Sequence, residues 1–211
     1  MDSVPYIFCD AVAETIAGIK EINEQLEAAD HPGFSSWKAL FRNHFENRWN
    51  VSLSIGFTRG DWSCTLEWKS ISGYSPFDVI NLRQLKKKYL RVNSVKVDSS
   101  RSRRSNLQEI EQVINYILPC VNLATLSLDN KEIYETDLSV LLSYFQRLSF
   151  ESITVRHYRK CYDHFLARHL KSGCLRELVL NGERWSHELQ AGIQEFILKK
   201  PVRRVDCRDA N

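Results

Sequence analysis

The sequence predicts an α/β fold, in which a strand–helix array with a parallel sheet follows a β-hairpin and a small N-terminal helical unit. Three observations predict it. A short apolar template recurs five times from about residue 90, helical patterns fill the gaps between its copies, and apolar and polar residues alternate over 49–69. Strands joined through helices by short connections form parallel sheets with right-handed crossovers. We therefore divide the chain into residues 1–48 and 49–211.

The recurring template is apolar-x-x-apolar-x-apolar, and its copies begin 31, 27, 25 and 27 residues apart. The five copies are Val92/Val95/Val97, Leu123/Leu126/Leu128, Phe150/Ile153/Val155, Leu175/Leu178/Leu180 and Val202/Val205/Cys207. This pattern resembles the strand signature of leucine-rich repeats, whose units have about 20–29 residues. A single unit cannot bury its apolar face, whereas stacked units can. The alternative is an α/β domain without a repeat origin.

Each gap between copies contains apolar residues at helical spacing. Ser105 with Gln108 fits a capping box, and Thr136 and Ser186 are expected to cap the next helices. The four apolar stripes are Leu107, Ile110, Val113, Ile114 and Ile117; Leu138, Leu141, Leu142 and Phe145; Phe165, Leu166 and Leu170; and Leu189, Ile193, Phe196 and Ile197.

The remaining residues of each predicted strand point to the opposite side of the sheet, because side chains alternate along a strand. They should stack into two columns, Ser94, Thr125, Ser152, Glu177 and Arg204 in one and Lys96, Ser127, Thr154, Val179 and Asp206 in the other. Solenoid proteins bind partners on such extended surfaces. We therefore predict a partner-binding face made of Lys96, Thr125, Ser127, Ser152, Thr154, Glu177, Arg204 and Asp206. The alternative is that these side chains are merely solvated.

The alternation over 49–69 predicts a β-hairpin with its turn at Thr58-Arg59-Gly60-Asp61. We interpret the Arg-Gly-Asp triplet as this turn rather than as an adhesion motif. After the hairpin, Ser75-Pro76 is expected to open a helix that uses Phe77, Ile80, Leu85 and Tyr89 as its apolar side.

Residues 1–48 contain apolar stripes typical of short helices. Val4-Pro5, followed by Phe8, Val12, Ile16 and Trp37, resembles an F-box, and the whole chain resembles nematode families that join an F-box-like N-terminus to a repeat-like domain. The opening residues 1–10 and the segment 53–57 carry the second likeness. The resemblance implies a substrate adaptor of a cullin–RING (SCF-type) ubiquitin ligase. Val4, Pro5, Phe8, Val12, Ile16 and Trp37 would bind the small adaptor subunit, and the repeats would hold an unknown substrate protein.

Two non-ligase roles stay open, a stand-alone protein-binding scaffold and an enzyme that uses the region 157–169. Residues 1–48 could be a helical cap on the apolar edge of the first repeat, which solenoids require. The chain would then be a stand-alone repeat scaffold that binds a protein.

Composition and motifs favour binding over catalysis. A net charge of +3 does not indicate nucleic acid, and no run of about 18 apolar residues predicts a membrane span. Six scattered cysteines without a CxxC pair indicate a reduced, intracellular protein, cytoplasmic or nuclear. No cofactor motif is present. The densest polar cluster comprises His157, Cys161, Asp163, His164 and His169, which we interpret as helix-surface residues rather than a metal or catalytic site.

Overall fold

The computed structural model describes residues 10, 12–13, 19–28, 35–70, 73–77, 89–99, 104–182, 185–199 and 202–208. The chain forms two compact units. One comprises residues 1–49 together with 84–91, and we call it the helical unit. The other comprises residues 50–83 and 92–211, and we call it the sheet unit. Segment 84–91 thus belongs with the N-terminal residues although it lies far from them in the sequence.

The described residues form a nine-stranded mixed sheet. Its order is β3 (Gly73–Phe77), β2 (Asp61–Ser70), β1 (Trp49–Thr58), β4 (Leu90–Asp98), β6 (Val121–Leu128), β7 (Phe150–Val155), β8 (Glu177–Asn181) and β9 (Arg204–Arg208), with β5 (Arg104–Ser105) paired to β2. Strands β1, β2 and β3 are antiparallel, and β4, β6, β7, β8 and β9 are parallel. The structure is therefore α/β, as predicted.

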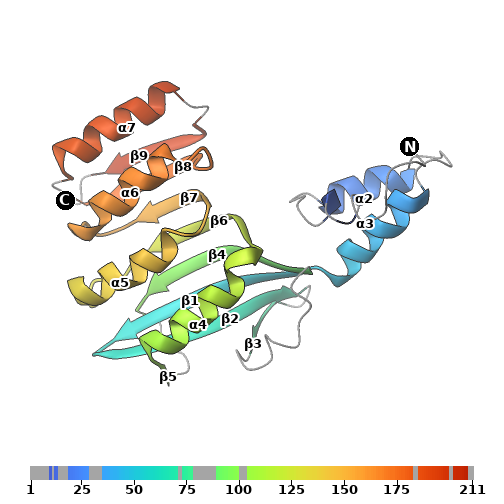
Figure 1. Cartoon of the computed structure of the whole chain (residues 1–211), viewed down its shortest axis with the longest axis horizontal. Helices are drawn as coiled ribbons and strands as arrows, with labels where there is room; N and C mark the ends of the chain where they lie inside the picture. The colour runs from blue at the N-terminus through green and yellow to red at the C-terminus, as the bar shows by residue number, and fades with distance from the viewer. Residues whose placement is uncertain are drawn as a thin grey trace. The chain divides into compact units, whose positions relative to one another are not determined.

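Each connection between the parallel strands contains a helix. These are α4 (Leu107–Ile117), which continues into the 3₁₀ turn η4 (Leu118–Cys120), α5 (Glu135–Phe145), α6 (Cys161–Lys171) and α7 (His187–Lys199). The strand order advances in one direction, so right-handed crossovers place all four helices on one side of the sheet. Figure 1 shows them stacked side by side in front of the strands.

This one-sided arrangement has a geometric consequence. Neighbouring strands lie about 4.8 Å apart, whereas packed helices need about 8–10 Å between their axes. A layer with one helix per strand is therefore wider than its strands, so the array has to bend toward the side without helices. No described helix of the sheet unit covers that side, which we call the open face.

Apolar residues between the sheet and the helices form the core. The second and third template residues of the first four copies are fully buried, together with Phe145, Phe150 and Phe165. The prediction that the first template residue of the second copy is buried is wrong. Leu123 is 40% exposed, and Ala124 is buried in its place. Strand β6 has irregular register on both sides of this segment, so the template is shifted there by one residue.

The fifth copy is less buried than the others. Val205 is half-buried and Cys207 is exposed, because β9 lies at the edge of the sheet.

The hairpin prediction is confirmed. Thr58 pairs with Asp61, and Arg59 and Gly60 between them have φ angles of 54° and 89°. Two successive positive φ angles define the I′ turn that suits a two-residue hairpin.

The prediction that a helix opens at Ser75-Pro76 is wrong. Both residues lie in β3, where Pro76 pairs with Glu67. Proline is compatible with this place because β3 is an edge strand, where a missing N–H costs little. Ile80 and Leu85 lie outside the described residues.

Helix starts agree only partly with the sequence. Asn106 and Glu109 form the capping box of α4, one residue later than the expected Ser105 and Gln108. Helix α5 begins after Tyr134 without a side-chain cap, so Thr136 does not cap it. Ser186 does cap α7, since its Oγ accepts a hydrogen bond from the Leu189 amide at 3.2 Å.

Gly192 lies in the middle of α7 and offers a simple stability test. A Cβ added there meets only Leu170 Cδ1, at 3.5 Å, which is an ordinary contact. Gly192→Ala is therefore expected to raise the free energy of unfolding by about 1 kcal/mol, because alanine favours the helix more than glycine does. Chemical denaturation measures this. A destabilised variant would show that the space above Gly192 is needed.

The helical unit contains α2 (Ile19–Ala28) and α3 (Ser35–Asn47). Ala13, Leu40 and Phe41 are its buried centre. Ile22, Leu26 and Trp37 pack against them and are partly buried. The unit thus has a small core of its own.

Candidate partner-binding surfaces

The open face carries the two predicted columns. Strand pairing aligns Ser94 with Thr125, Thr125 with Ser152, Ser152 with Glu177 and Glu177 with Arg204. It also aligns Lys96, Ser127, Thr154, Val179 and Asp206 in the same way. The geometry of the columns is therefore confirmed. Their hydroxyl groups continue onto β1, because Ser94 Oγ donates to Ser52 Oγ at 3.1 Å.

The middle of this face is rich in hydroxyl groups without a protein partner. Among the described residues, the side chains of Ser127, Ser152 and Thr154 make no hydrogen bond. Thr125 makes only a long one, 3.4 Å to the Asn93 carbonyl. These hydroxyls are half-buried or exposed on two adjacent strands, so they can donate to or accept from a bound molecule.

Charges frame the hydroxyl groups. Arg204 is paired with Asp206 at 2.8 Å at the β9 edge. Lys96 on β4 and Glu177 on β8 have no ion pair within the described part of the chain. The charged residues of the predicted binding face therefore comprise one ion pair, Arg204 with Asp206, and two residues without an ion pair in the described chain, Lys96 and Glu177.

Leu123 adds an exposed apolar side chain at the beginning of β6. Its φ angle is 56°, a left-handed conformation that costs a non-glycine residue about 1–2 kcal/mol. Such strained residues often occur at functional sites. The sequence template placed Leu123 in the core, so sequence reasoning missed this feature.

Asn130 fixes the strand ends beside the open face, and sequence reasoning missed it too. Its side chain is almost fully buried. Nδ2 donates to the carbonyls of Phe57 and Asp98, at the ends of β1 and β4. Oδ1 accepts from the amides of Glu132 and Ile133 at 2.7 and 3.2 Å. One amide therefore joins two strands to the loop that precedes α5.

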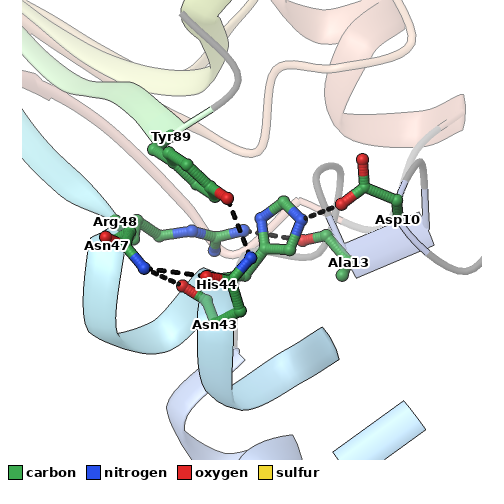
Figure 2. Close-up of polar contacts among 7 residues, drawn as sticks. All are labelled: Asp10, Ala13, Asn43, His44, Asn47, Arg48 and Tyr89. Atoms are coloured by element: carbon green, nitrogen blue, oxygen red, sulfur yellow. Dashed lines mark hydrogen bonds and ion pairs between the residues drawn. The ribbon is translucent and has the colours of Figure 1, made fainter. Parts of the chain in front are cut away.

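A second candidate surface is the helical unit, whose polar contacts are drawn in Figure 2. His44 is fully buried, and its Nε2 lies 2.8 Å from Asp10 Oδ1. The Arg48 guanidinium donates to the Ala13 carbonyl at 2.7 Å. Both contacts join α3 or its end to the first helical residues, which stabilises the unit as one body.

Tyr89 completes this network from the distant segment 84–91. Its hydroxyl accepts a hydrogen bond from Asn43 Nδ2 at 2.8 Å, and its ring lies edge-on to His44. Asn47 in turn donates to Asn43 at 2.9 Å. The sequence offered no signal for this attachment. It predicted that Tyr89 belongs to a helix opening at Ser75-Pro76, whereas the structure has a strand there.

The predicted adaptor-binding residues are only partly visible in the described chain. Val12 is half-buried. Trp37 packs against Phe41, and their ring centroids lie 5.7 Å apart. Val4, Pro5, Phe8 and Ile16 lie outside the described residues. Phe45 on α3 is 42% exposed.

The polar cluster around α6 does not form one site. His157 contacts Asp129 at 3.2 Å, and burial is the main cause that lowers its pKa. His164 contacts Gln146, and Asp163 accepts from the Tyr158 hydroxyl. No three His, Cys, Asp or Glu residues gather as metal ligands in the part of the chain that is described.

Cys161 and His169 are also poorly suited to acid–base or nucleophilic chemistry. Burial, and next to it Glu135, raises the pKa of the Cys161 thiol to about 12, so the thiolate is disfavoured at neutral pH. His169 is buried between Phe150 and Phe165, whose ring centroids lie 5.4 and 4.5 Å away.

A groove of about 1140 Å³ lies between α6 and α7, on the helix side of the sheet unit. Leu170, Leu189 and Phe196 form its floor but are themselves buried. Ala167 and Gly192 leave the space open. The α6 side of the groove carries Lys160, Asp163, His164 and Lys171, and the α7 side carries Glu188 and Glu195, so charges of both signs line it.

Comparison with protein-family profiles, with curated proteins and with solved structures finds no match for this chain. In the described residues, no helix has both the length and the apolar character needed to cross a membrane.

Proposed function

We propose that this chain is a non-enzymatic protein-binding module that acts as a substrate adaptor of a cullin–RING (SCF-type) ubiquitin ligase. The open face of the sheet unit would hold the substrate protein, and the helical unit would bind the small adaptor subunit. The chain itself would perform no chemistry. It would supply proximity, which raises the effective concentration of the substrate at the ligase.

The open face is the observation that carries the binding role. Four helices lie on the opposite side, and within the described chain the columns present unpaired hydroxyl or charged groups on four adjacent strands, β4, β6, β7 and β8. Polar groups of this kind give a partner hydrogen bonds without first breaking internal ones. The wider helix layer on the other side favours a bend toward this face, which is the side that solenoids use to bind proteins.

We also propose that the array is leucine-rich-repeat-like. The copies start at a nearly constant spacing, and each is one strand followed by one helix. The consensus of such repeats has an Asn or Cys three residues after its third leucine. Asn130 has a comparable place, two residues after Leu128, and it ties neighbouring strands together.

The two-unit division supports separate tasks for the two units. The helical unit has its own core and its own polar network, and it exposes Phe45. An exposed aromatic side chain is a common anchor in protein interfaces.

Affinity for the small adaptor subunit of cullin–RING ligases tests this proposal. We expect the full chain to capture the adaptor, and Phe45→Ala to weaken capture about tenfold, as loss of an aromatic anchor does. Tyr134→Ala is the matched control, because Tyr134 is an exposed aromatic residue in the sheet unit. Absence of capture by the unmodified chain would rule out the ligase role.

One observation favours a second candidate, a stand-alone repeat scaffold without a ligase. Trp37 packs partly into the core of the helical unit, so only part of its ring is presented to a partner. If the adaptor is not captured while the open face still binds a protein, this second candidate is the better description.

A further inference from the structure

The two unpaired charges on the open face have a defined separation. Lys96 on β4 and Glu177 on β8 are three strand spacings apart, which corresponds to about 14 Å across the sheet. They belong to different columns, two residues apart along the strands, which adds about 7 Å in the perpendicular direction. The two positions are therefore separated by about 16 Å along a diagonal.

Hydroxyl groups occupy the interval between these charges. Thr125 and Ser127 lie on β6, and Ser152 and Thr154 lie on β7. We call these four residues, together with Lys96 and Glu177, the diagonal strip. It has a cation at one end, an anion at the other and neutral hydrogen-bonding groups between them.

Another charge on the same side helps to define the strip. Glu67 on β2 pairs with Ser52, so its side chain faces the same way, and it has no ion pair among the described residues. It lies on the far side of Lys96, two strands away from β4. A partner attracted only by the overall charge of this face would change its affinity when Glu67 is substituted. A partner seated on the strip would not.

The backbone of the sheet limits the form of the occupant. The parallel strands already use their N–H and C=O groups for pairing with each other. An extended segment lying on the face would leave its own backbone groups without partners, and strand addition occurs at sheet edges instead. A helix satisfies its backbone internally, so it can lie on this face and use only its side chains.

We propose that the partner bound by the open face presents a helix with an acidic residue over Lys96 and a basic residue over Glu177. Residues eleven apart lie on one side of a helix and about 16 Å apart along its axis, which matches the strip. Serine, threonine, asparagine or glutamine residues between the two charges would contact the four hydroxyl groups. This inference rests on the proposed protein-binding role of the open face and adds the chemistry of the partner.

Selection from a display library tests the inference. The library presents single helices on a rigid scaffold with one side randomised, and the full chain is the target. We expect enriched helices to carry an acid–base pair ten to twelve residues apart, and Lys96→Glu and Glu177→Lys each to weaken their binding about tenfold. Glu67→Lys makes the same charge change outside the strip and should leave affinity within about twofold.

A charge exchange provides the stricter test. The double variant Lys96→Glu/Glu177→Lys keeps the net charge of the chain, and it should regain affinity for a selected helix whose own acid and base are exchanged. Equal binding of the selected helices to the original chain and to this double variant would overturn the inference. So would enrichment of helices without the charge pair.

Failure of this inference and failure of the ligase role are distinguishable, because adaptor capture depends on the helical unit and is measured separately. Thermal unfolding of each variant shows whether it is folded. All three substituted residues are half-buried or exposed and make no ion pair within the described chain, so the substitutions are expected to leave the fold intact.

Discussion

Asn130→Ala is expected to lower the free energy of unfolding of the sheet unit by about 3–4 kcal/mol. The substitution removes four hydrogen bonds at once, two of them buried and two part-buried, and the loss of each costs about 1 kcal/mol. The affected carbonyls belong to Phe57 and Asp98, so the ends of β1 and β4 lose their attachment to the loop before α5. Denaturant unfolding followed by circular dichroism measures the loss.

Asn130→Asp separates the two halves of this network. An aspartate keeps an acceptor for the amides of Glu132 and Ile133 but loses the donor that holds the two carbonyls. We expect it to be at least as destabilising as alanine, because a carboxylate would then face two carbonyl oxygens. Asn115→Ala is the matched control, since Asn115 only accepts a surface bond from Arg147. If both Asn130 variants were as stable as this control, the role of Asn130 would be refuted.

The second large effect concerns His169 and acid. Burial, with a smaller contribution from Arg168, lowers the pKa of His169 to about 4, whereas an unfolded histidine titrates near 6.5. The unfolded chain therefore takes up the proton first as the pH falls. Stability from this group is complete above about pH 6.5, is lost between about 6.5 and 4, and does not fall further below the folded pKa.

The expected loss follows from the difference of about 2.5 pKa units. At about 1.36 kcal/mol for each unit, it amounts to about 3 kcal/mol between pH 7 and pH 4. His169→Leu should remove this component, so the variant should be less sensitive to acid than the original chain. At pH 7 the cost should be small, because the Nε2 atom of His169 has no hydrogen-bond partner among the described residues.

Denaturant unfolding at pH 7, 5.5 and 4 measures the effect as the difference between variant and original chain, which cancels the contribution of carboxyl groups. His187→Leu is the control, because His187 is exposed at the start of α7. Parallel pH profiles for the original chain and His169→Leu would show that His169 is not the acid-sensitive group.

Local patterns in the sequence were sufficient for most of the sheet unit. Alternation over 49–69 predicted β1 and β2, and the helical stripes predicted α4, α5, α6 and α7. The column residues were predicted correctly from strand periodicity alone, since side chains must alternate once the inward residues are known. These features depend on residues that are close in the chain, and so they appear in the sequence as periodic patterns of apolar residues.

Predictions were wrong where a distant segment decided the outcome. Leu123 matches the template, yet irregular pairing of β6 with both neighbours moves Ala124 into the core. Ser75-Pro76 looks like the start of a helix, but β2 offers an edge with which this segment pairs. The capping residue of α4 differs by one position, which is within the uncertainty of any helix end.

The candidate surfaces show the same division. Sequence alone placed Lys96 and Glu177 in neighbouring columns, but only the structure shows that neither has an ion partner among the described residues. Asn130 had no sequence signal, because an Asp-Asn pair after a strand is indistinguishable from an ordinary loop. Its bonds reach residues 73 and 32 positions away.

Periodicity is a local property of the chain, and it was therefore enough to predict the alternation of strands and helices, the parallel array and the outward columns. Four other features became known from the folded chain: which segments share a unit, where the template shifts by one residue, which charges stay unpaired in the described part, and which single amide joins two strands to a loop. Each of these depends on contacts between residues far apart in the chain, and such contacts are set by packing of the whole unit rather than by local pattern.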